Sequence, residues 1–539
     1  MSARSRIFVL ARALLLIAYA IVLFHHTSRS VGGSDSSGYL NAARLFASGR
    51  VTEPIRGLRR LGLPQDFARV FVPLGYTPLE EPGRMAPSYP PGWPLHMALA
   101  AKLGGWATAP FLVSPIAGLA SLVLMYFLGR ELRLPPSFAF AGSALLAFFP
   151  TFVYLALQPM SDVVATAWAL AAVLAAYRFR ASFRVGWAVA AGAAFGIGVL
   201  VRPTNVLVFL PLLFVFPPRW KAWVGFVSGG MLCAIFLFAY NTALFGNPLT
   251  TGYGSILGSL AWSDFPQRAR HYAYWTGRLL TPVLPLGWLA LGFDRHAPVR
   301  DRAALLVWFS AFFLFYSFYP PYETWWYTRF LLPGFPAMIL GACVAARDFI
   351  LPGGRSRPAR WSTAATLVLL TAALFVEVDF TEKHRLHRLY KSERIYPQAC
   401  AMARRRIPSN GIIASMQMSG ALHYYTDLTY AMWNWLDSER FALLRSSTES
   451  RGYRWYALLA PFEVPEVAKN LPGDWRAIDR TGDVVLWELP PAPRPIGSGP
   501  FVAPRPDEDP EIRLDVARFG EPLLRRAQAR HQQSSHGSP

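Results

Sequence analysis

Long apolar segments recur through the first 377 residues of the chain, and polar connectors separate them. The clear segments are 7–24, 107–129, 136–157, 161–177, 185–201, 222–245, 303–319, 331–346 and 362–376. Two weaker segments, 204–216 and 278–293, are short or interrupted by proline. About 20 apolar residues in a helix cross a hydrocarbon core of about 30 Å. The pattern therefore predicts an all-α polytopic membrane region over residues 1–377, with about eleven transmembrane helices once the topology includes the weaker segments.

The composition agrees with lipid as the surroundings of most of the chain. Hydrophobic residues make up 53% of the chain and charged residues 16%, whereas soluble proteins contain about 45–50% and about 25%. The net charge of +21 would suit a protein that binds nucleic acid. The basic residues lie mainly in connectors between apolar segments, however, so we expect a membrane and no nucleic acid as partner.

The charge of the connectors predicts how the chain crosses the membrane. Those on one side carry sixteen Lys and Arg residues, and the short connectors on the other side carry four, namely Arg202, Arg268, Arg270 and Arg329. Because cytoplasmic connectors hold the basic excess, we place the N-terminus in the cytoplasm. The 25–93 loop and the region after residue 377 then lie outside. The high Arg, Ala and Pro content hints at a bacterial source, and hence at the inner membrane.

Residues 7–24 could instead be a signal peptide, since they follow Arg4 and Arg6. Arg12 interrupts the apolar run, and no small-x-small cleavage pattern follows it. We therefore expect a retained first helix.

Two regions outside the membrane have patterns of their own. In the outer loop 25–93, apolar residues at helical spacing follow Ser34 and Asp35 and predict a helix along the membrane surface. Residues 380–489 predict an α/β domain, with a helix at 395–406 and strands at Gly411–Ser415, Trp455–Ala460 and Val484–Leu489. It carries no catalytic motif, so a lid or docking module is its simplest interpretation. Residues 490–539 have few apolar side chains and are expected to be a disordered tail.

Asp35 and Asp162 are the acids that stand out at the outer ends of apolar segments. Asp35, about ten residues after the first segment, is either a general base at the membrane surface or the cap of the following helix. Asp162 begins a predicted helix, where a carboxylate also fits as a cap. The pattern leaves both alternatives open for each residue.

Three cations lie on the same outer side, namely Lys102, Arg202 and Arg329. Their side chains could reach towards lipid headgroups. A guanidinium fork also matches phosphate oxygens, so the arginines are candidates for phosphate binding. Lys102 could act in the same way.

In order along the chain, these features resemble the GT-C superfamily of polyprenyl-phosphate-sugar glycosyltransferases, which includes protein O-mannosyltransferases and aminoarabinose transferases. The matching features are the acid in Ser34-Asp35-Ser36-Ser37-Gly38-Tyr39, the Tyr89-Pro90-Pro91-Gly92-Trp93-Pro94 turn, the Ser161-Asp162 helix start, Arg202-Pro203-Thr204-Asn205, and Arg329 before Phe330-Leu331-Leu332-Pro333-Gly334-Phe335-Pro336-Ala337. The resemblance spans roughly residues 5–350.

The resemblance implies a GT-C fold of 11–13 helices whose site faces outward. It implies transfer of a sugar from a polyprenyl-phosphate-linked donor to a lipid, glycan or protein acceptor, with Asp35 as catalytic base. Arg202, Arg329 and Lys102 would bind the donor phosphate. The substrate pocket would include Asp162, Tyr89, Pro91, Trp93, Glu323 and Tyr327. Many relatives have two adjacent acids in this loop, but here Ser34 precedes Asp35, so the acceptor class and a divalent metal as cofactor are left open.

The chemistry agrees with a single acid. A glycosidase generally needs a second carboxylate to protonate a poor leaving group, whereas a phosphate leaves as a stable anion. One base for the acceptor and cations for the phosphate are then enough, and the reaction would invert the anomeric centre. The strongest alternative from another class is a transporter or flippase of lipid-linked sugars. Secondary transporters usually contain internal repeats, and we find none in this sequence.

Overall fold

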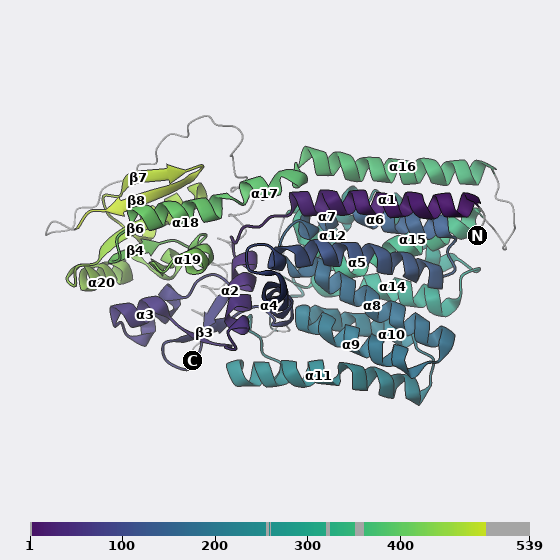
Figure 1. Ribbon diagram of the computed structural model, residues 1–539, viewed down its shortest axis with the longest axis horizontal. Helices are drawn as coiled ribbons and strands as arrows, with labels where there is room; N and C mark the ends of the chain where they lie inside the picture. Colours follow the sequence, from purple (N-terminus) through teal and green to yellow (C-terminus); the bar gives the residue numbers. More distant parts are fainter. Residues whose placement is uncertain (1–2, 255–257, 259, 320–323, 351–359, 492–539) are drawn as a thin grey trace. The chain divides into compact units, whose positions relative to one another are not determined.

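The computed structural model describes residues 3–254, 258, 260–319, 324–350 and 360–491 (Figure 1). By their internal contacts these residues form two compact units. The helical unit contains 3–27 and Pro90–Leu389, and the mixed unit contains Ser28–Tyr89 and 390–491. The predicted tail at 490–539 lies almost wholly outside the described residues.

The helical unit is built from helices that pack along one another (Figure 1). In chain order they are α1 (Ala3–His26), α4 (Gly92–Gly104), α5 (Ala109–Glu131), α6 (Pro136–Phe148), α7 (Pro150–Ala156), α8 (Ser161–Ser182), α9 (Val185–Val201), η2 (Pro203–Val208), α10 (Phe209–Val215), α11 (Trp220–Phe245), α12 (Phe265–Leu279), α13 (Val283–Ala290), η4 (Leu291–Phe293), α14 (Val299–Ser317), η5 (Trp325–Gly334), α15 (Phe335–Ile350), α16 (Arg360–Lys383) and η7 (Leu386–Arg388). The helix α17 (Leu389–Ser392) contains the boundary between the units.

Every apolar segment predicted from the sequence coincides with at least one of these helices. Within the described part of the chain, five helices are long and apolar enough to cross a membrane, or six if α6 and α7 form one span. Those two helices meet at an angle of 64°, where Phe149 precedes Pro150 and proline cannot continue the hydrogen-bond ladder. The prediction of membrane-spanning helices is thus confirmed, and the number eleven stays a prediction because several helices are short.

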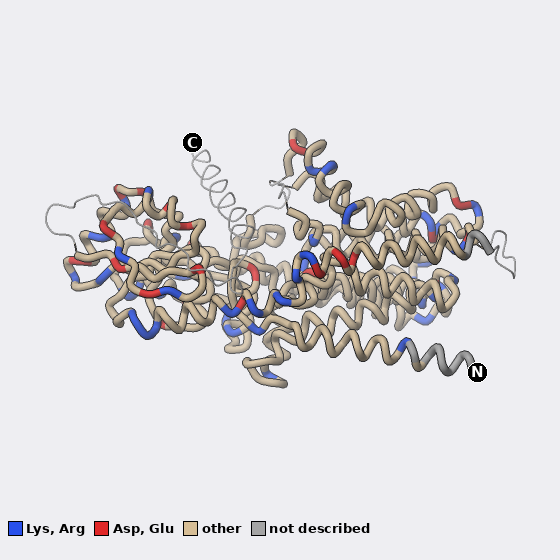
Figure 2. The backbone as a smooth tube through the Cα atoms, turned by 90° about the horizontal axis from the view of Figure 1, so that it is seen from above, with Lys and Arg blue, Asp and Glu red and all other residues tan. Residues whose placement is uncertain are grey.

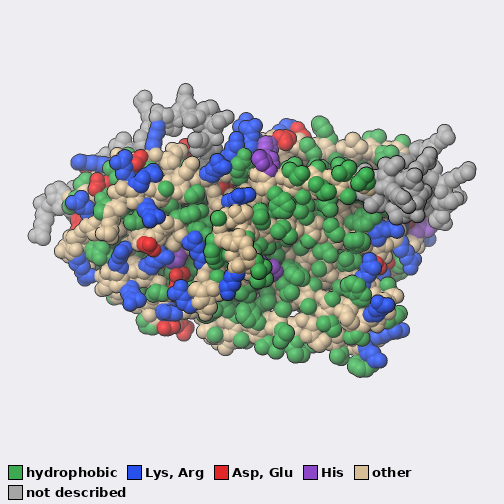
Figure 3. Space-filling model, viewed as in Figure 1, with side chains coloured by type: hydrophobic (Ala, Val, Ile, Leu, Met, Phe, Trp, Pro, Cys, Tyr) green, Lys and Arg blue, Asp and Glu red, His purple; other side chains and the backbone are tan. Residues whose placement is uncertain are grey.

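The surface of the helical unit suits a hydrocarbon solvent. Its helices carry few charged residues along most of their length (Figure 2), and apolar side chains cover most of the face in view (Figure 3). In α11 only 17% of the apolar membrane-spanning stretch is buried inside the protein. Leu232 of this helix is 79% exposed. By contrast, 78% of the apolar stretch of α8 is buried, so this helix lies inside the bundle.

The mixed unit combines two sheets with short helices. Its elements are α2 (Asp35–Ala47), β1 (Glu53–Pro54), α3 (Arg56–Leu61), η1 (Gln65–Phe71), β2 (Tyr76–Pro78), β3 (Arg84–Pro87), α18 (Ile395–Arg406), β4 (Gly411–Ala414), α19 (Ser419–Tyr425), β5 (Thr429–Ala431), η8 (Trp433–Trp435), α20 (Ser438–Glu449), β6 (Arg454–Leu459), η9 (Pro461–Glu463), α21 (Val464–Asn470), β7 (Arg476–Thr481) and β8 (Val484–Leu489). The predicted helix at 395–406 and the three predicted strands are confirmed, and β5 and β7 were not predicted.

The larger sheet has the strand order β5-β4-β6-β8-β7, in which β4 runs parallel to β5 and β6 and the β6–β8 and β8–β7 pairs are antiparallel. Side chains alternate between its two faces, as the two-residue period of a strand requires. Ile413 and Leu458 point towards a core that contains Ile395 of α18. Ile412 and Trp455 point towards the other core.

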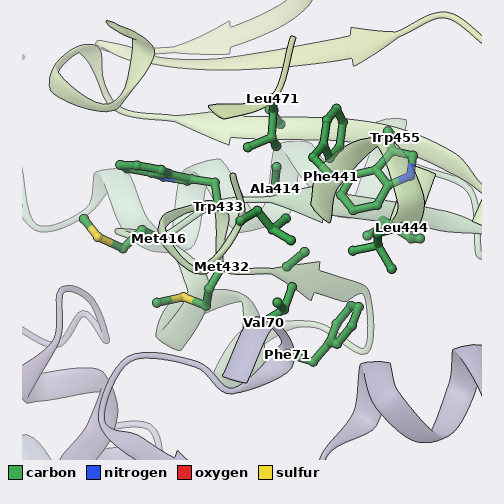
Figure 4. Packing of buried hydrophobic residues seen from close by; sticks show 14 of the residues in the cluster. Val70, Phe71, Ala414, Met416, Met432, Trp433, Phe441, Leu444, Trp455 and Leu471 are labelled. Atoms are coloured by element: carbon green, nitrogen blue, oxygen red, sulfur yellow. The ribbon is translucent and has the colours of Figure 1, made fainter. Parts of the chain in front are cut away.

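That second core contains residues of the 25–93 segment. Val70 lies beside Met432, and Phe71 and Trp433 belong to the same cluster of buried residues (Figure 4). The backbone N–H of Met432 donates to the carbonyl of Val70 at 2.6 Å. The segment Ser28–Tyr89 is therefore one face of the mixed unit, whereas the sequence suggested a loop of the membrane region. Its apolar residues pack against residues more than 300 positions away in the chain.

The helix α2 begins at Asp35, as predicted, but its setting differs from the prediction. Nine of its thirteen residues are buried, and it packs against α19. Its apolar residues are therefore covered by other residues of the mixed unit. A helix that lies along a membrane would instead bury its apolar face in the lipid.

Glu463 is a buried carboxylate at the centre of the mixed unit. It accepts from the backbone N–H groups of Met416, Gln417 and Ala460 at 2.9–3.1 Å and from the indole N–H of Trp433 at 2.8 Å. Burial raises the pKa of Glu463, and the four donors lower it in part.

Replacing Glu463 with glutamine should destabilise the mixed unit by about 2–3 kcal/mol. One carboxylate oxygen would become an NH₂ group that faces N–H donors, and hydrogen bonds to charged groups contribute about 1.5–3 kcal/mol each. Denaturant unfolding of the purified chain measures the change. Glu439→Gln, at an exposed position, is the control and should change the free energy of unfolding by less than about 0.5 kcal/mol. Equal effects of the two substitutions would contradict the role given to Glu463.

Candidate functional site

An ionic cluster lies at one end of α8 in the helical unit. Asp162, in the first turn of α8, is completely buried and forms a salt bridge with Nη1 of Arg202. Nε of Arg329 lies 3.9 Å from the same carboxylate oxygen. The side chains of Arg202 and Arg329 are 11% and 13% exposed to solvent. The structure thus brings together three of the residues singled out in the sequence.

Local sequence explains how Arg202 reaches this carboxylate. Pro203 disfavours helix for the residue before it, so α9 ends at Val201 and Arg202 is extended, with φ −150° and ψ 109°. Asn205 then donates from Nδ2 to the carbonyl of Ala165 at 2.9 Å, which ties η2 to α8 one turn beyond Asp162. The N-cap residue of α8 is Met160, so Asp162 lies inside the first turn and its carboxylate pairs with Arg202.

Aromatic rings support the guanidinium of Arg202. Its carbon Cζ lies 5.2 Å from the ring centre of Phe330 and 5.9 Å from that of Tyr316, and those two rings stack on each other with their centres 5.0 Å apart. The Phe330 ring is also 5.5 Å from Cζ of Arg329. Cations over aromatic faces are stabilised electrostatically, so both guanidinium groups are held against one aromatic surface.

Asp35 and Tyr89 form a second group, in the mixed unit. The hydroxyl of Tyr89 donates to Oδ1 of Asp35 at 2.7 Å and lies 2.9 Å from Oγ of Ser34. Burial and then the charge of Asp35 raise the pKa of Tyr89 well above its ordinary value, so the phenol keeps its proton and remains a donor. Asp35 is partly exposed. It directly follows Ser34, the N-cap residue of α2, and Tyr89 orients its carboxylate.

The other predicted site residues have varied surroundings. Trp93 is fully buried and donates from Nε1 to the carbonyl of Pro159 at 3.3 Å, so it packs inside the helical unit. Pro91 is the residue before α4, and Tyr327 is buried with its ring 5.8 Å from that of Phe330. Lys102 is exposed in the last turn of α4, and no ion pair joins it to the described residues. Glu323 lies outside the described residues.

Replacing Tyr89 with phenylalanine should lower kcat of the transfer reaction proposed below about tenfold, because a hydrogen bond to a charged group contributes about 1.5–3 kcal/mol. The phenyl ring would keep its packing with Tyr39, whose ring centre is 4.4 Å away. Steady-state kinetics of the purified chain provide the measurement. Tyr39→Phe, which alters the neighbouring ring, is the matched control. A Tyr89→Phe chain with unchanged kcat would contradict the orienting role of Tyr89.

Comparisons with known proteins found one family model and several solved structures that are similar to this chain. Residues 88–244 match the family model described as dolichyl-phosphate-mannose-protein mannosyltransferase. The structure of ArnT from Cupriavidus metallidurans bound to undecaprenyl phosphate is 14% identical, and the similarity covers 88% of this chain and 97% of that chain with a TM-score of 0.52. The apo structure of that ArnT is 15% identical, with 90% and 98% covered and a TM-score of 0.52.

The chain has the GT-C fold. The resemblance inferred from the sequence motifs is thereby confirmed. The mycobacterial arabinofuranosyltransferase AftD is 12% identical, and the similarity covers 91% of this chain and 41% of that chain with a TM-score of 0.47. No curated protein sequence matches the chain. The family match contains Asp162 and Arg202 but neither Asp35 nor Arg329.

Sequence reasoning missed the partners that fix the site residues within this GT-C fold. Phe330 and Tyr316 lie in apolar segments of the sequence, and nothing there indicates that their rings face Arg202. The contact between Asp35 and Tyr89 spans 54 positions, and the two residues belong to different sequence motifs. Among the described residues, no group of three or more His, Cys, Asp or Glu side chains could hold a metal ion.

Proposed function

We propose that this chain is an integral-membrane glycosyltransferase that moves a sugar from a polyprenyl-phosphate-linked donor to a lipid, glycan or protein acceptor. Transfer would occur on the extracytoplasmic face, with inversion at the anomeric carbon. The observation that carries the proposal is Arg202, which Asp162 orients while its side chain stays partly exposed beside Arg329. The GT-C fold and the undecaprenyl phosphate bound to ArnT support the same donor class.

The guanidinium groups suit the donor phosphate. A guanidinium has five N–H donors, and among the described residues the guanidinium of Arg202 donates only from Nη1, to Asp162. The remaining donors can bind phosphate oxygens in the forked geometry that arginine favours. As the bond between the anomeric carbon and the phosphate oxygen breaks, negative charge develops on that oxygen, and the cations stabilise it.

Asp35 would complete the reaction at the acceptor. Its carboxylate takes the proton of the attacking hydroxyl or amine while the acceptor atom bonds to the anomeric carbon. The lipid phosphate leaves with the electron pair of the broken bond, so no second acid is needed. The mechanism requires Asp35 of the mixed unit and the arginines of the helical unit to act on one substrate, which is a prediction of the proposal.

A reconstituted transfer assay tests the proposed function. Purified chain in lipid vesicles would receive polyprenyl-phosphate-linked sugars together with lipid and glycan acceptors. We expect equal amounts of free polyprenyl phosphate and glycosylated acceptor, with the product anomer opposite to that of the donor. If the polyprenyl-phosphate-linked sugar moves between leaflets and no free polyprenyl phosphate is released, the chain is a flippase and the proposal is rejected. Mass spectrometry of lipid that co-purifies with the chain would identify the donor class.

A further inference from the structure

We propose that α19 and Tyr396, in the C-terminal part of the chain, position Asp35 for catalysis. The inference rests on the proposed function and assigns a role to the 390–491 segment, in which no catalytic motif is found. Its basis is a set of contacts inside the mixed unit. These contacts hold both the helix that begins at Asp35 and the loop that precedes it.

The first set of contacts joins α19 to one face of α2. Nδ2 of Asn41 donates to the carbonyl of Gly420 at 2.9 Å, and Nη1 of Arg44 donates to the carbonyl of Tyr424 at 2.7 Å. The Arg44 guanidinium also lies 3.4 Å from the ring centre of Tyr424. A Cβ at Gly420 would lie 2.0 Å from Oγ of Ser37. Residues 37, 41 and 44 are neighbours on a helix surface, so α19 lies directly along this face.

The second set of contacts holds the loop before Asp35. The backbone N–H of Val31 donates to the hydroxyl of Tyr425 at 2.9 Å. The ring of Tyr396 lies so close over Gly32 that a Cβ there would be 2.0 Å from Cδ2. Gln417 donates from Nε2 to the hydroxyl of Tyr396 at 2.7 Å. Glycine at position 32 is thus required by the close approach of an aromatic ring from the C-terminal segment.

Hydrogen bonds couple the loop to the start of α2. Oγ of Ser36 donates to the carbonyl of Gly32 at 2.5 Å, and the backbone N–H of Ser37 donates to the same carbonyl at 3.3 Å. Asp35 lies between these groups, so a displacement of α19 or Tyr396 would move its backbone. In positioned catalysis, a shift of about 1 Å can cost about 10²-fold in rate. The C-terminal segment therefore sets the position of the base, Asp35, although Asp35 belongs to the Ser28–Tyr89 segment.

Replacing Gly420 with alanine tests the inference, because its methyl group would collide with Ser37 and push α19 away from α2. We expect kcat to fall about tenfold to a hundredfold, with the KM for the lipid-linked donor within about twofold of the original. Amide hydrogen exchange at residues 31–37 should also become faster. The double variant Gly420→Ala/Ser37→Gly, which restores space at this contact, should recover part of kcat.

Gly411→Ala is the matched control. Its added Cβ would lie 2.2 Å from Cγ2 of Ile407, a comparable collision in the same segment that involves neither α2 nor the loop. We expect it to lower thermal stability, with kcat of the folded chain and exchange at 31–37 unchanged. Equal loss of kcat in both variants, or unchanged kcat or unchanged exchange in Gly420→Ala, would overturn the positioning role. Absence of transfer by the unaltered chain would contradict the proposed function, while the exchange comparison would still decide whether α19 fixes the loop.

Discussion

Replacing Asp35 with asparagine should lower kcat of sugar transfer about a thousandfold, with little change in the KM of the lipid-linked donor. The amide is close in size to the carboxylate and can still accept the hydrogen bond from Tyr89, which spans 2.7 Å. It cannot take a proton from the acceptor, and a positioned general base contributes roughly 10²–10⁴-fold. Because only the proton acceptor is lost, donor binding through the arginines should persist.

Asp66→Asn is the control for this substitution. Asp66 lies in the same Ser28–Tyr89 segment and is exposed, so its loss should leave both kcat and KM unchanged. Initial rates with a radiolabelled donor, at several acceptor concentrations, separate the two constants. Full transfer activity in the Asp35→Asn chain would remove Asp35 from the mechanism. A large rise in the donor KM with kcat retained would assign Asp35 to donor binding.

Replacing Arg202 with glutamine should destabilise the helical unit by about 3–5 kcal/mol and abolish transfer. The substitution leaves the buried Asp162 carboxylate with only the more distant Arg329, whose Nε is 3.9 Å away. Breaking a buried pair from one side carries a penalty of about that size. Oδ2 of Asp162 already has no hydrogen-bond partner among the described residues, so the carboxylate depends strongly on Arg202. Thermal unfolding in detergent and the transfer assay measure the two effects.

The double variant Asp162→Asn/Arg202→Gln separates folding from function. Two neutral amides replace the ion pair, so most of the lost stability should return, because a buried pair can be exchanged for neutral groups at small cost. Transfer should stay absent, since the guanidinium that binds the donor phosphate is still missing. Arg180→Gln, which breaks the 2.7 Å pair with Asp301 elsewhere in the helical unit, is the control and should leave the donor KM unchanged. A double variant that regains transfer would limit Arg202 to a structural role.

Much of the secondary structure could be predicted from the sequence, because local patterns specify it. Each apolar segment coincides with a helix, and the strands at 411, 455 and 484 alternate apolar side chains between two cores. The short strand Thr429–Ala431 and the polar strand Arg476–Thr481 escaped prediction. The first has only three residues, and the second is long enough but lacks the apolar alternation that distinguishes a strand without its neighbours.

The sequence by itself determined that the chain has membrane-spanning helices, a C-terminal α/β region and an acid, Asp35, ahead of the cations Lys102, Arg202 and Arg329. These properties follow from runs of apolar residues and from single charged residues, which can be recognised in the local sequence. Only the tertiary structure decided that Ser28–Tyr89 shares a core with residue 390 onwards, and that Asp162 pairs with Arg202. Such contacts join positions from 40 to almost 400 apart, and nothing in a local pattern specifies which distant side chain will satisfy a buried charge or cover an apolar face.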